Sequence, residues 1–145
     1  MMDKYEKILE IRKRQLNKAL DRLSYSFHKV SKLPLSVDAF DDETLESWES
    51  FSARFARASD IFLSQYLRTY VLITDKGFQG SLRDFLNTAE KLRLIDNAEV
   101  WMNIRELRNI SAHEYTEEDL VAVFKRLLLE CPRLLSIQEK INALN

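Results

Sequence analysis

The chain has 145 residues, of which 46% are apolar, and its 22 Lys and Arg residues nearly cancel its 23 Asp and Glu residues. A chain of this length and composition can form one domain, spanning 1–145, with a full hydrophobic core. The balanced charge excludes the global cationic excess that marks many nucleic-acid-binding proteins, so any RNA contact must be local.

The low content of glycine and proline predicts the fold class. The chain has two of each, whereas sheets and their tight turns need more, so we predict an all-α protein. Its single cysteine, Cys131, excludes an internal disulfide and a cysteine-based zinc site. No stretch reaches the ~20 apolar residues of a membrane span, and the early charges are untypical of a signal peptide. We therefore expect a soluble cytoplasmic protein with no membrane association.

The first predicted helix covers residues 3–32. Apolar residues recur in it at helical spacing and form one seam, made of Leu9, Leu16, Leu20, Leu23, Phe27 and Val30. Its other faces are rich in Lys and Arg, which is typical of a solvated surface but also suits contact with RNA phosphates. Pro34 should end this helix, because a residue before proline resists the α conformation.

The second predicted helix covers about 43–76. Six acids between Asp38 and Glu49 suit the start of a helix, and capping explains them better than a metal site does. From Ile61 to Ile73 apolar residues point in nearly all directions, so this part must be buried on every side. We infer that some of it faces a second copy of the chain in a two-fold dimer. The alternative is a central helix that its own domain buries.

Three further helices are predicted from their capping signals. Each signal is a capping residue with an acid three positions later. These signals are Ser81 with Asp84, Asp96 with Glu99, and Thr116 with Asp119. They predict helices at about 82–94, 97–112 and 117–131. Gly77 suits the left-handed residue after a helix, and Pro132 should end or kink the last helix, leaving a final piece at 133–143. Five helices with short links predict an up-and-down bundle.

A polar cluster at 107–115 carries the candidate chemistry. Arg108, His113 and Tyr115 place a cation, an imidazole and a phenol within eight residues, just before a new helix begins. Such groups can handle a phosphodiester without a metal. On an ideal helix Arg108 and His113 are about 140° apart, so joint action requires the helix to end near Ala112 or a cleft that two chains build. The alternatives are a polar helix end, with His113 as a C-terminal cation and Tyr115 as a packing residue.

These residues resemble HEPN domains, specifically the HepT-like branch. The match consists of the Arg-x4-His-x-Tyr pattern at 108–115, the flanking Trp101-x3-Arg105-Glu106-x-Arg108-Asn109, and Arg54-Phe55-x4-Asp60 on the second helix. The resemblance covers essentially the whole chain and fits its length, its five predicted helices and a two-fold dimer.

The resemblance implies a metal-independent ribonuclease without a cofactor. Members of this family form two-fold dimers whose motifs meet across a cleft, where the ribose 2′-hydroxyl attacks the phosphorus and leaves a 2′,3′-cyclic phosphate. By position, His113 would transfer the proton, Arg108 would hold the phosphate, and Asn109 would orient substrate or the imidazole. Tyr115 would receive AMP units from a minimal nucleotidyltransferase antitoxin, which would block the cleft.

Two function classes follow from these observations. The first is a ribonuclease toxin that a nucleotidyltransferase silences, as the presence of Arg108, His113 and Tyr115 favours. The second is a non-catalytic substrate-binding or antitoxin-type subunit of a minimal nucleotidyltransferase, which relatives with this fold also form and which the near-neutral charge favours.

Overall fold

The computed structural model describes residues 3–113 and 115–144, and the elements in these ranges are helical. The α-helices are α1 (Lys4–Val30), α2 (Asp42–Asp60), α3 (Leu67–Thr74), α4 (Leu82–Lys91), α5 (Ala98–Ser111) and α6 (Glu117–Ala143). A 3-10 turn, η1 (Val37–Ala39), precedes α2, and a π-helical segment, η2 (Ile61–Tyr66), joins α2 directly to α3. The described residues therefore form five helical rods, and the prediction of an all-α fold is confirmed.

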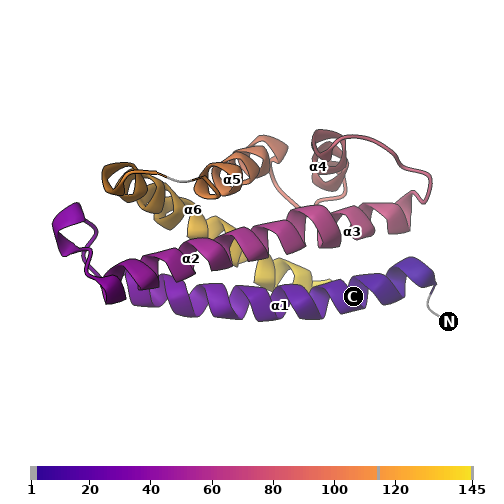
Figure 1. The fold of residues 1–145 in the computed structure, drawn as a ribbon. Coiled ribbons are helices and arrows are strands. Elements are labelled where there is room, and N and C mark those ends of the chain that lie inside the picture. The colour runs from indigo at the N-terminus through magenta and orange to yellow at the C-terminus, as the bar shows by residue number, and fades with distance from the viewer. Residues whose placement is uncertain (1–2, 114, 145) are drawn as a thin grey trace.

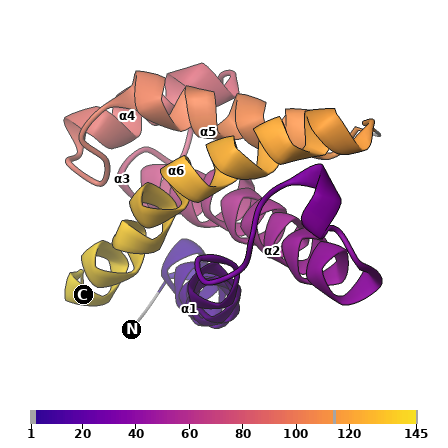
Figure 2. The same cartoon turned by 90° about the vertical axis from the view of Figure 1, so that its left-hand side faces the viewer.

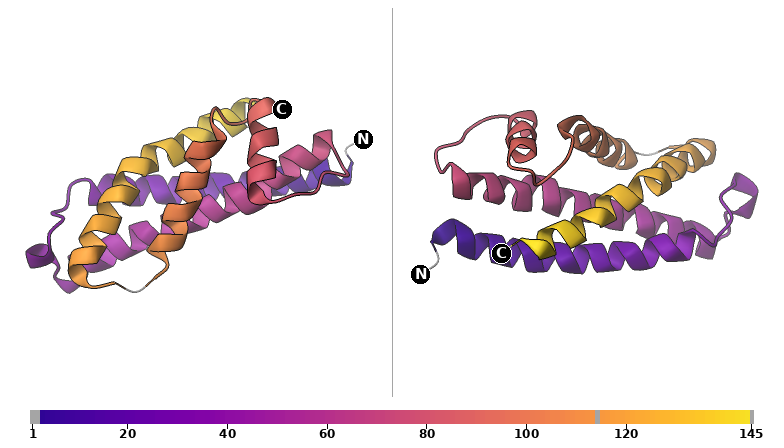
Figure 3. Two further views of the ribbon diagram at one scale, coloured as in Figure 1. Left: turned by 90° about the horizontal axis from the view of Figure 1, so that it is seen from above. Right: turned by 180° about the vertical axis from the view of Figure 1, so that it is seen from behind.

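The rods pack in a two-layer arrangement. α1 and the continuous rod α2–η2–α3 run antiparallel along one side of the molecule (Figure 1). α4 and α5 cross that rod steeply, and α6 runs diagonally back across α1 (Figure 3). No helix in the described part of the chain is both long enough and apolar enough to cross a membrane.

The predicted seam of α1 faces the core. Leu16, Leu20 and Leu23 are fully buried, and Val30 is 1% exposed. Leu9 and Phe27 are partly buried and pack against the same core. The helix begins where a side chain can cap it, since the Asp3 carboxylate accepts a hydrogen bond from the amide of Glu6.

The apolar run from Ile61 to Ile73 is covered largely by its own chain. Phe62, Leu63 and Leu67 are fully buried within one protomer, and the Phe62 ring lies 4.8 Å from that of Trp101 on α5. α1 packs on η2 and α3, α4 packs on α3, and Trp101 of α5 packs on Phe62, so one chain buries most of this run. Tyr70, Leu72 and Ile73 stay half-buried. The dimer itself stays a prediction.

Most of the helix ends follow from local capping. Ser81 and Asp84 form the predicted reciprocal capping box, and Thr116 accepts a hydrogen bond from the amide of Asp119. At α5 the cap is Asn97 rather than Asp96, since the Asn97 side chain accepts from the amides of Glu99 and Val100.

The expected left-handed residue lies elsewhere. Neither Gly77 nor Gly80 has a positive φ, whereas Arg93 has a φ of 63° just after α4. The amide of Leu94 donates to the carbonyl of Ala89, and that of Arg93 donates to Glu90. This pair of bonds is a Schellman motif, in which glycine usually holds the position of Arg93.

Pro132 does not end the last helix. α6 continues from Glu117 to Ala143 with Pro132 inside it, so residues 133–143 do not form a separate helix, and of the two expected outcomes, an end or a kink, the kink occurs (Figure 2). Pro132 is exposed, while its neighbour Cys131 and Leu134 are fully buried. Burial of the residues on both sides holds the helix together where proline removes one hydrogen bond. The two halves of α6 lie at an angle to each other (Figure 2).

Candidate functional site

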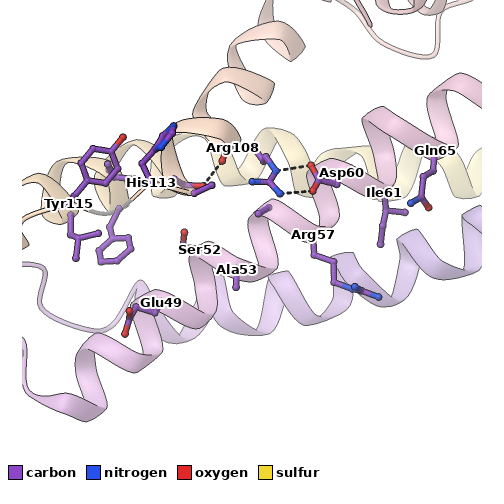
Figure 4. Close-up of a pocket in the computed structure, with 16 residues that line it drawn as sticks. Glu49, Ser52, Ala53, Arg57, Asp60, Ile61, Gln65, Arg108, His113 and Tyr115 are labelled. Carbon is purple, nitrogen blue, oxygen red and sulfur yellow. Dashed lines mark hydrogen bonds and ion pairs between the residues drawn. The ribbon is translucent and has the colours of Figure 1, made fainter.

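A wide groove lies between α2 and the junction of α5 with α6. It has a volume of about 890 Å³ and is open to solvent. Its lining comes from three rods, and Figure 4 shows the side chains. The polar lining consists of Glu49, Ser52, Arg57, Asp60, Gln65, Arg108, Ser111, His113 and Tyr115. Three of the four residues expected from the sequence therefore share one groove.

Arg108 forms the central polar contact of the groove. Its Nε donates to Oδ1 of Asp60, and its Nη2 donates to Oδ2, each over 2.8 Å. This bidentate pair joins α5 to the last residue of α2 (Figure 4). The hydrogen bond with Asp60 raises the pKa of Arg108, so the guanidinium stays charged. The pair is part-exposed, with the arginine side chain 26% and the aspartate side chain 37% accessible.

His113 lies just beyond the end of α5. The helix ends at Ser111, and Ala112 caps it. A helix end near Ala112 is what the sequence analysis required for His113 and Arg108 of one chain to act together. The His113 amide donates to the carbonyl of Ile110 over 3.2 Å, which keeps the turn tight. The His113 side chain is exposed at the groove, so solvent or a ligand can reach the imidazole.

Tyr115 lies beside the histidine and also packs. Its ring is edge-on to that of His113, with 6.4 Å between the ring centroids. The side chain is half-buried and rests against the hydrophobic core. The packing role and the groove role that the sequence left open therefore occur together in one residue.

Asn109 is not part of the groove. It lies on α5 next to Arg108, but its side chain is exposed and the groove lining does not include it. Successive helical residues differ in direction by about 100°, so Arg108 and Asn109 cannot both face α2. Within one chain, the expected role of Asn109 in orienting substrate has no support from this geometry.

Sequence reasoning missed the contribution of α2. Its groove face consists of Glu49, Ser52, Ala53, Ala56, Arg57 and Asp60, spaced three, one, three, one and three apart. The small residues in the middle of this face leave the space that forms the groove. That spacing was a usable signal, since it marks one helix face opposite the aromatic face of Trp48, Phe51 and Phe55.

The π-helical segment adjoins the same face. η2 begins one residue after Asp60 and carries Gln65, whose Oε1 accepts a hydrogen bond from Arg12 on α1 over 3.1 Å. Segments of this kind often occur at functional sites, because the extra residue in the turn redirects nearby side chains. Here the wide turn lies at the edge of the groove, between Asp60 and Gln65.

The groove has a charged end and a mainly apolar end, at which Glu49 adds a carboxylate (Figure 4). Arg57, Asp60 and Arg108 lie toward the start of η2, and Leu120, Val123 and Phe124 of α6 lie at the other end beside Tyr115. Such a groove can hold a ligand that is charged on one side and flat or apolar on the other. Within residues 3–113 and 115–144, no group of three or more His, Cys, Asp and Glu side chains is placed to hold a metal ion.

Comparison with known proteins gives no assignment. No protein-family model and no curated protein matches this chain.

Proposed function

We propose that this chain is a metal-independent RNA endonuclease of the HEPN type, the toxin of a toxin and nucleotidyltransferase pair. The observation that carries the proposal is that Arg108 and His113 line one solvent-open groove, although they face different directions on an ideal helix. The groove thus holds both a phosphate-binding cation and a proton-transfer group.

The proposed reaction is an internal phosphoryl transfer. The ribose 2′-oxygen attacks the adjacent phosphorus, the bond from phosphorus to the 5′-oxygen breaks, and the products are a 2′,3′-cyclic phosphate and a 5′-hydroxyl. One imidazole accepts the proton of the 2′-hydroxyl, and another returns a proton to the 5′-oxygen. His113 from each of two chains supplies these two groups in a dimer whose grooves face each other.

Arg108 is the proposed phosphate ligand. Asp60 engages Nε and Nη2, so two of the five N–H donors of the guanidinium are used, and Nη1 carries further donors for the phosphate. The bidentate contact also restrains the side chain, which reduces the entropy lost when phosphate binds. Asp60 is then a positioning residue, and Arg108 is the residue that contacts substrate.

Tyr115 is the proposed point of control. A minimal nucleotidyltransferase that adds AMP to its hydroxyl would place a bulky anion next to the His113 ring, 6.4 Å away between centroids. Repulsion between this added phosphate and the RNA phosphate would keep substrate out of the groove.

The test is RNA cleavage in EDTA by purified protein. Arg108→Ala and His113→Ala should each reduce the rate by at least about 100-fold, the usual scale for losing such a group. Two matched controls come from the same chain. Arg105→Ala removes an arginine of α5 outside the groove, and His28→Ala removes the exposed histidine of α1. Equal cleavage by the groove variants and the controls would refute the proposal.

A non-catalytic subunit is the second candidate function. The observation in its favour is the charge balance of the groove, where Asp60 and Glu49 offset Arg108 and Arg57. Such a groove would present a ligand to a minimal nucleotidyltransferase without attracting RNA strongly. Expression of the chain alone separates the two functions, because a toxin stops growth and its His113→Ala variant does not, whereas a binding subunit leaves growth unchanged in both cases.

A further inference from the structure

The outer face of α1 carries an unbroken stripe of exposed residues. Successive members are three or four positions apart and fall within about 80° of arc on an ideal helix. The members of this α1 stripe are Lys4, Lys7, Ile11, Arg14, Lys18, Arg22, Tyr25 and Lys29, and all eight are exposed. Six are cations, and the other two, Ile11 at 45% and Tyr25 at 67%, are among the most exposed large apolar residues of the described chain.

Positive charge is concentrated locally on the α1 stripe. The whole chain has a formal net charge of −1, so six cations on one face of one helix are not a consequence of composition. The acids near the stripe include Glu10 and Asp21 on its flank, Glu46 across the gap to α2, and Asp3 at the start of the helix, which caps it and pairs with Lys76. Asp21 accepts a hydrogen bond from Gln138 of α6 over 2.9 Å, which turns it away from the stripe.

The stripe is separate from the groove. The buried side of α1 packs against α2, η2, α3 and α6, and the rod α2–η2 lies between α1 and the groove (Figure 4). In Figure 1 α1 forms the side of the molecule opposite α4 and α5. A ligand on the stripe therefore does not occupy the site of Arg108 and His113.

We propose that the α1 stripe binds the backbone of single-stranded nucleic acid, with Tyr25 as a stacking platform for a base. The stripe is one helix wide and about 38 Å long at 1.5 Å per residue, which suits an extended single strand. Cations that follow one line along the surface, together with an exposed aromatic ring, are the elements of such surfaces. The Arg54 guanidinium of α2 lies 5.9 Å from the centroid of the Tyr25 ring and adds another cation.

A lipid surface fits this face less well. A helix that enters the membrane interface inserts an apolar face, and the apolar face of α1 is buried in the core at Leu16, Leu20 and Leu23. Only Ile11 and Tyr25 could reach lipid, and they lie about 21 Å apart along the helix. The α1 stripe is positively charged and has no apolar face that could insert into lipid. It therefore suits a dissolved polyanion, such as a nucleic acid, better than a membrane.

The experiment measures fluorescence anisotropy of a labelled oligothymidylate of about 12 nucleotides. This probe lacks 2′-hydroxyls, so the proposed cleavage cannot consume it, and binding is tested whether or not the chain is a nuclease. Six phosphate contacts predict a slope of about −4 for log K against log salt, or a loss on the order of 300-fold between 50 and 200 mM salt.

Two charge variants distinguish the stripe from overall charge. The stripe variant combines Arg14→Glu, Lys18→Glu and Arg22→Glu. It should abolish measurable binding or make the salt slope shallower, from about −4 to between about −2 and zero. Lys91→Glu, Lys125→Glu and Lys140→Glu together change the net charge equally, from −1 to −7, but lie on α4 and α6. This scattered variant should bind like the wild type. The same three stripe positions changed to Gln replace the first variant if circular dichroism shows that it unfolds.

Tyr25→Ala tests the stacking role. It should weaken binding at least about fivefold while leaving the salt slope unchanged, because stacking does not release counterions. Three results would overturn the proposal. They are equal losses in the stripe and scattered variants, no loss in either, and binding to anionic phosphatidylserine vesicles without binding to the oligonucleotide.

Discussion

The contact between Arg108 and Asp60 determines what the groove can do at the level of single residues. The guanidinium is held by two 2.8 Å hydrogen bonds, and its charge is offset by the carboxylate that holds it. In the proposed reaction Asp60 therefore has two opposing effects, because it holds Arg108 in position while its negative charge weakens the attraction of Arg108 for RNA phosphate.

This opposition predicts separate effects on kcat and KM. Asp60→Asn should lower KM for RNA about fivefold, because an anion leaves the groove, and should lower kcat, because Arg108 loses its bidentate partner. Glu49→Gln is the matched control, since it removes another anion from the same groove. Glu49 lies about three turns before Asp60 on α2, away from Arg108. It should lower KM and leave kcat unchanged. Steady-state cleavage kinetics provide both values, and identical kcat values for the two variants would show that Asp60 does not position Arg108.

At the scale of the element, the end of α4 is held in a conformation that its sequence does not favour. Arg93 has a φ of 63°, in the left-handed region where a Cβ crowds the backbone at a cost of about 1 kcal/mol. The Schellman hydrogen bonds of Arg93 and Leu94, together with burial of Leu94 and Ile95, maintain this turn.

Replacing this arginine should therefore stabilise the protein. Arg93→Gly should raise the free energy of unfolding by about 1 kcal/mol, because glycine adopts positive φ without the Cβ penalty. Lys91→Gly, two residues earlier in the last turn of α4, should lower it by about the same amount. Urea unfolding followed by circular dichroism measures both. A destabilised Arg93→Gly variant would show that the arginine side chain contributes more than its backbone conformation costs.

Elements that depend on neighbouring residues could be predicted from the sequence, and elements that depend on distant ones could not. The caps at Ser81 and Thr116 are local, and so is the seam of α1, so spacing was enough to predict them. The sequence left open whether Pro132 ends or kinks the last helix, because the burial of Cys131 and Leu134 that keeps it continuous comes from packing against other helices. The same holds for η2, whose wide turn depends on packing that no local pattern encodes.

The same distinction applies to the residues of the candidate site, since those close in sequence could be predicted and those far apart could not. Arg108, His113 and Tyr115 are close in sequence, and a helix end near Ala112 was enough to bring them to one groove. Asp60 is 48 positions from Arg108, and only the family resemblance drew attention to it. Asn109 was expected in the site because of its place in the motif, yet the helical rotation of one residue turns it away from α2.

For the whole molecule, the proposed reaction determines which face should pair with a second copy. The apolar residues of η2 and Leu67 are buried within their own chain, whereas Tyr70, Leu72 and Ile73 of α3 are only half-buried. The proposed reaction requires two His113 groups to act on one phosphodiester. Pairing through α3 would not bring the grooves together, whereas pairing across the open face between α2 and α6 would.

We therefore expect a dimer through the groove face. Light scattering at micromolar concentration should give about 34 kDa, twice the 17.1 kDa of one chain. Ala53→Glu places a charge on the exposed small-residue face of α2 in the groove and should produce a monomer that no longer cleaves RNA, although Arg108 and His113 are intact. Ile73→Glu, which places the same charge on α3, should leave both the dimer and the activity unchanged. A monomeric wild type that still cleaves RNA, or loss of the dimer only in Ile73→Glu, would contradict the composite site, because the second histidine would then have to come from somewhere other than a facing groove.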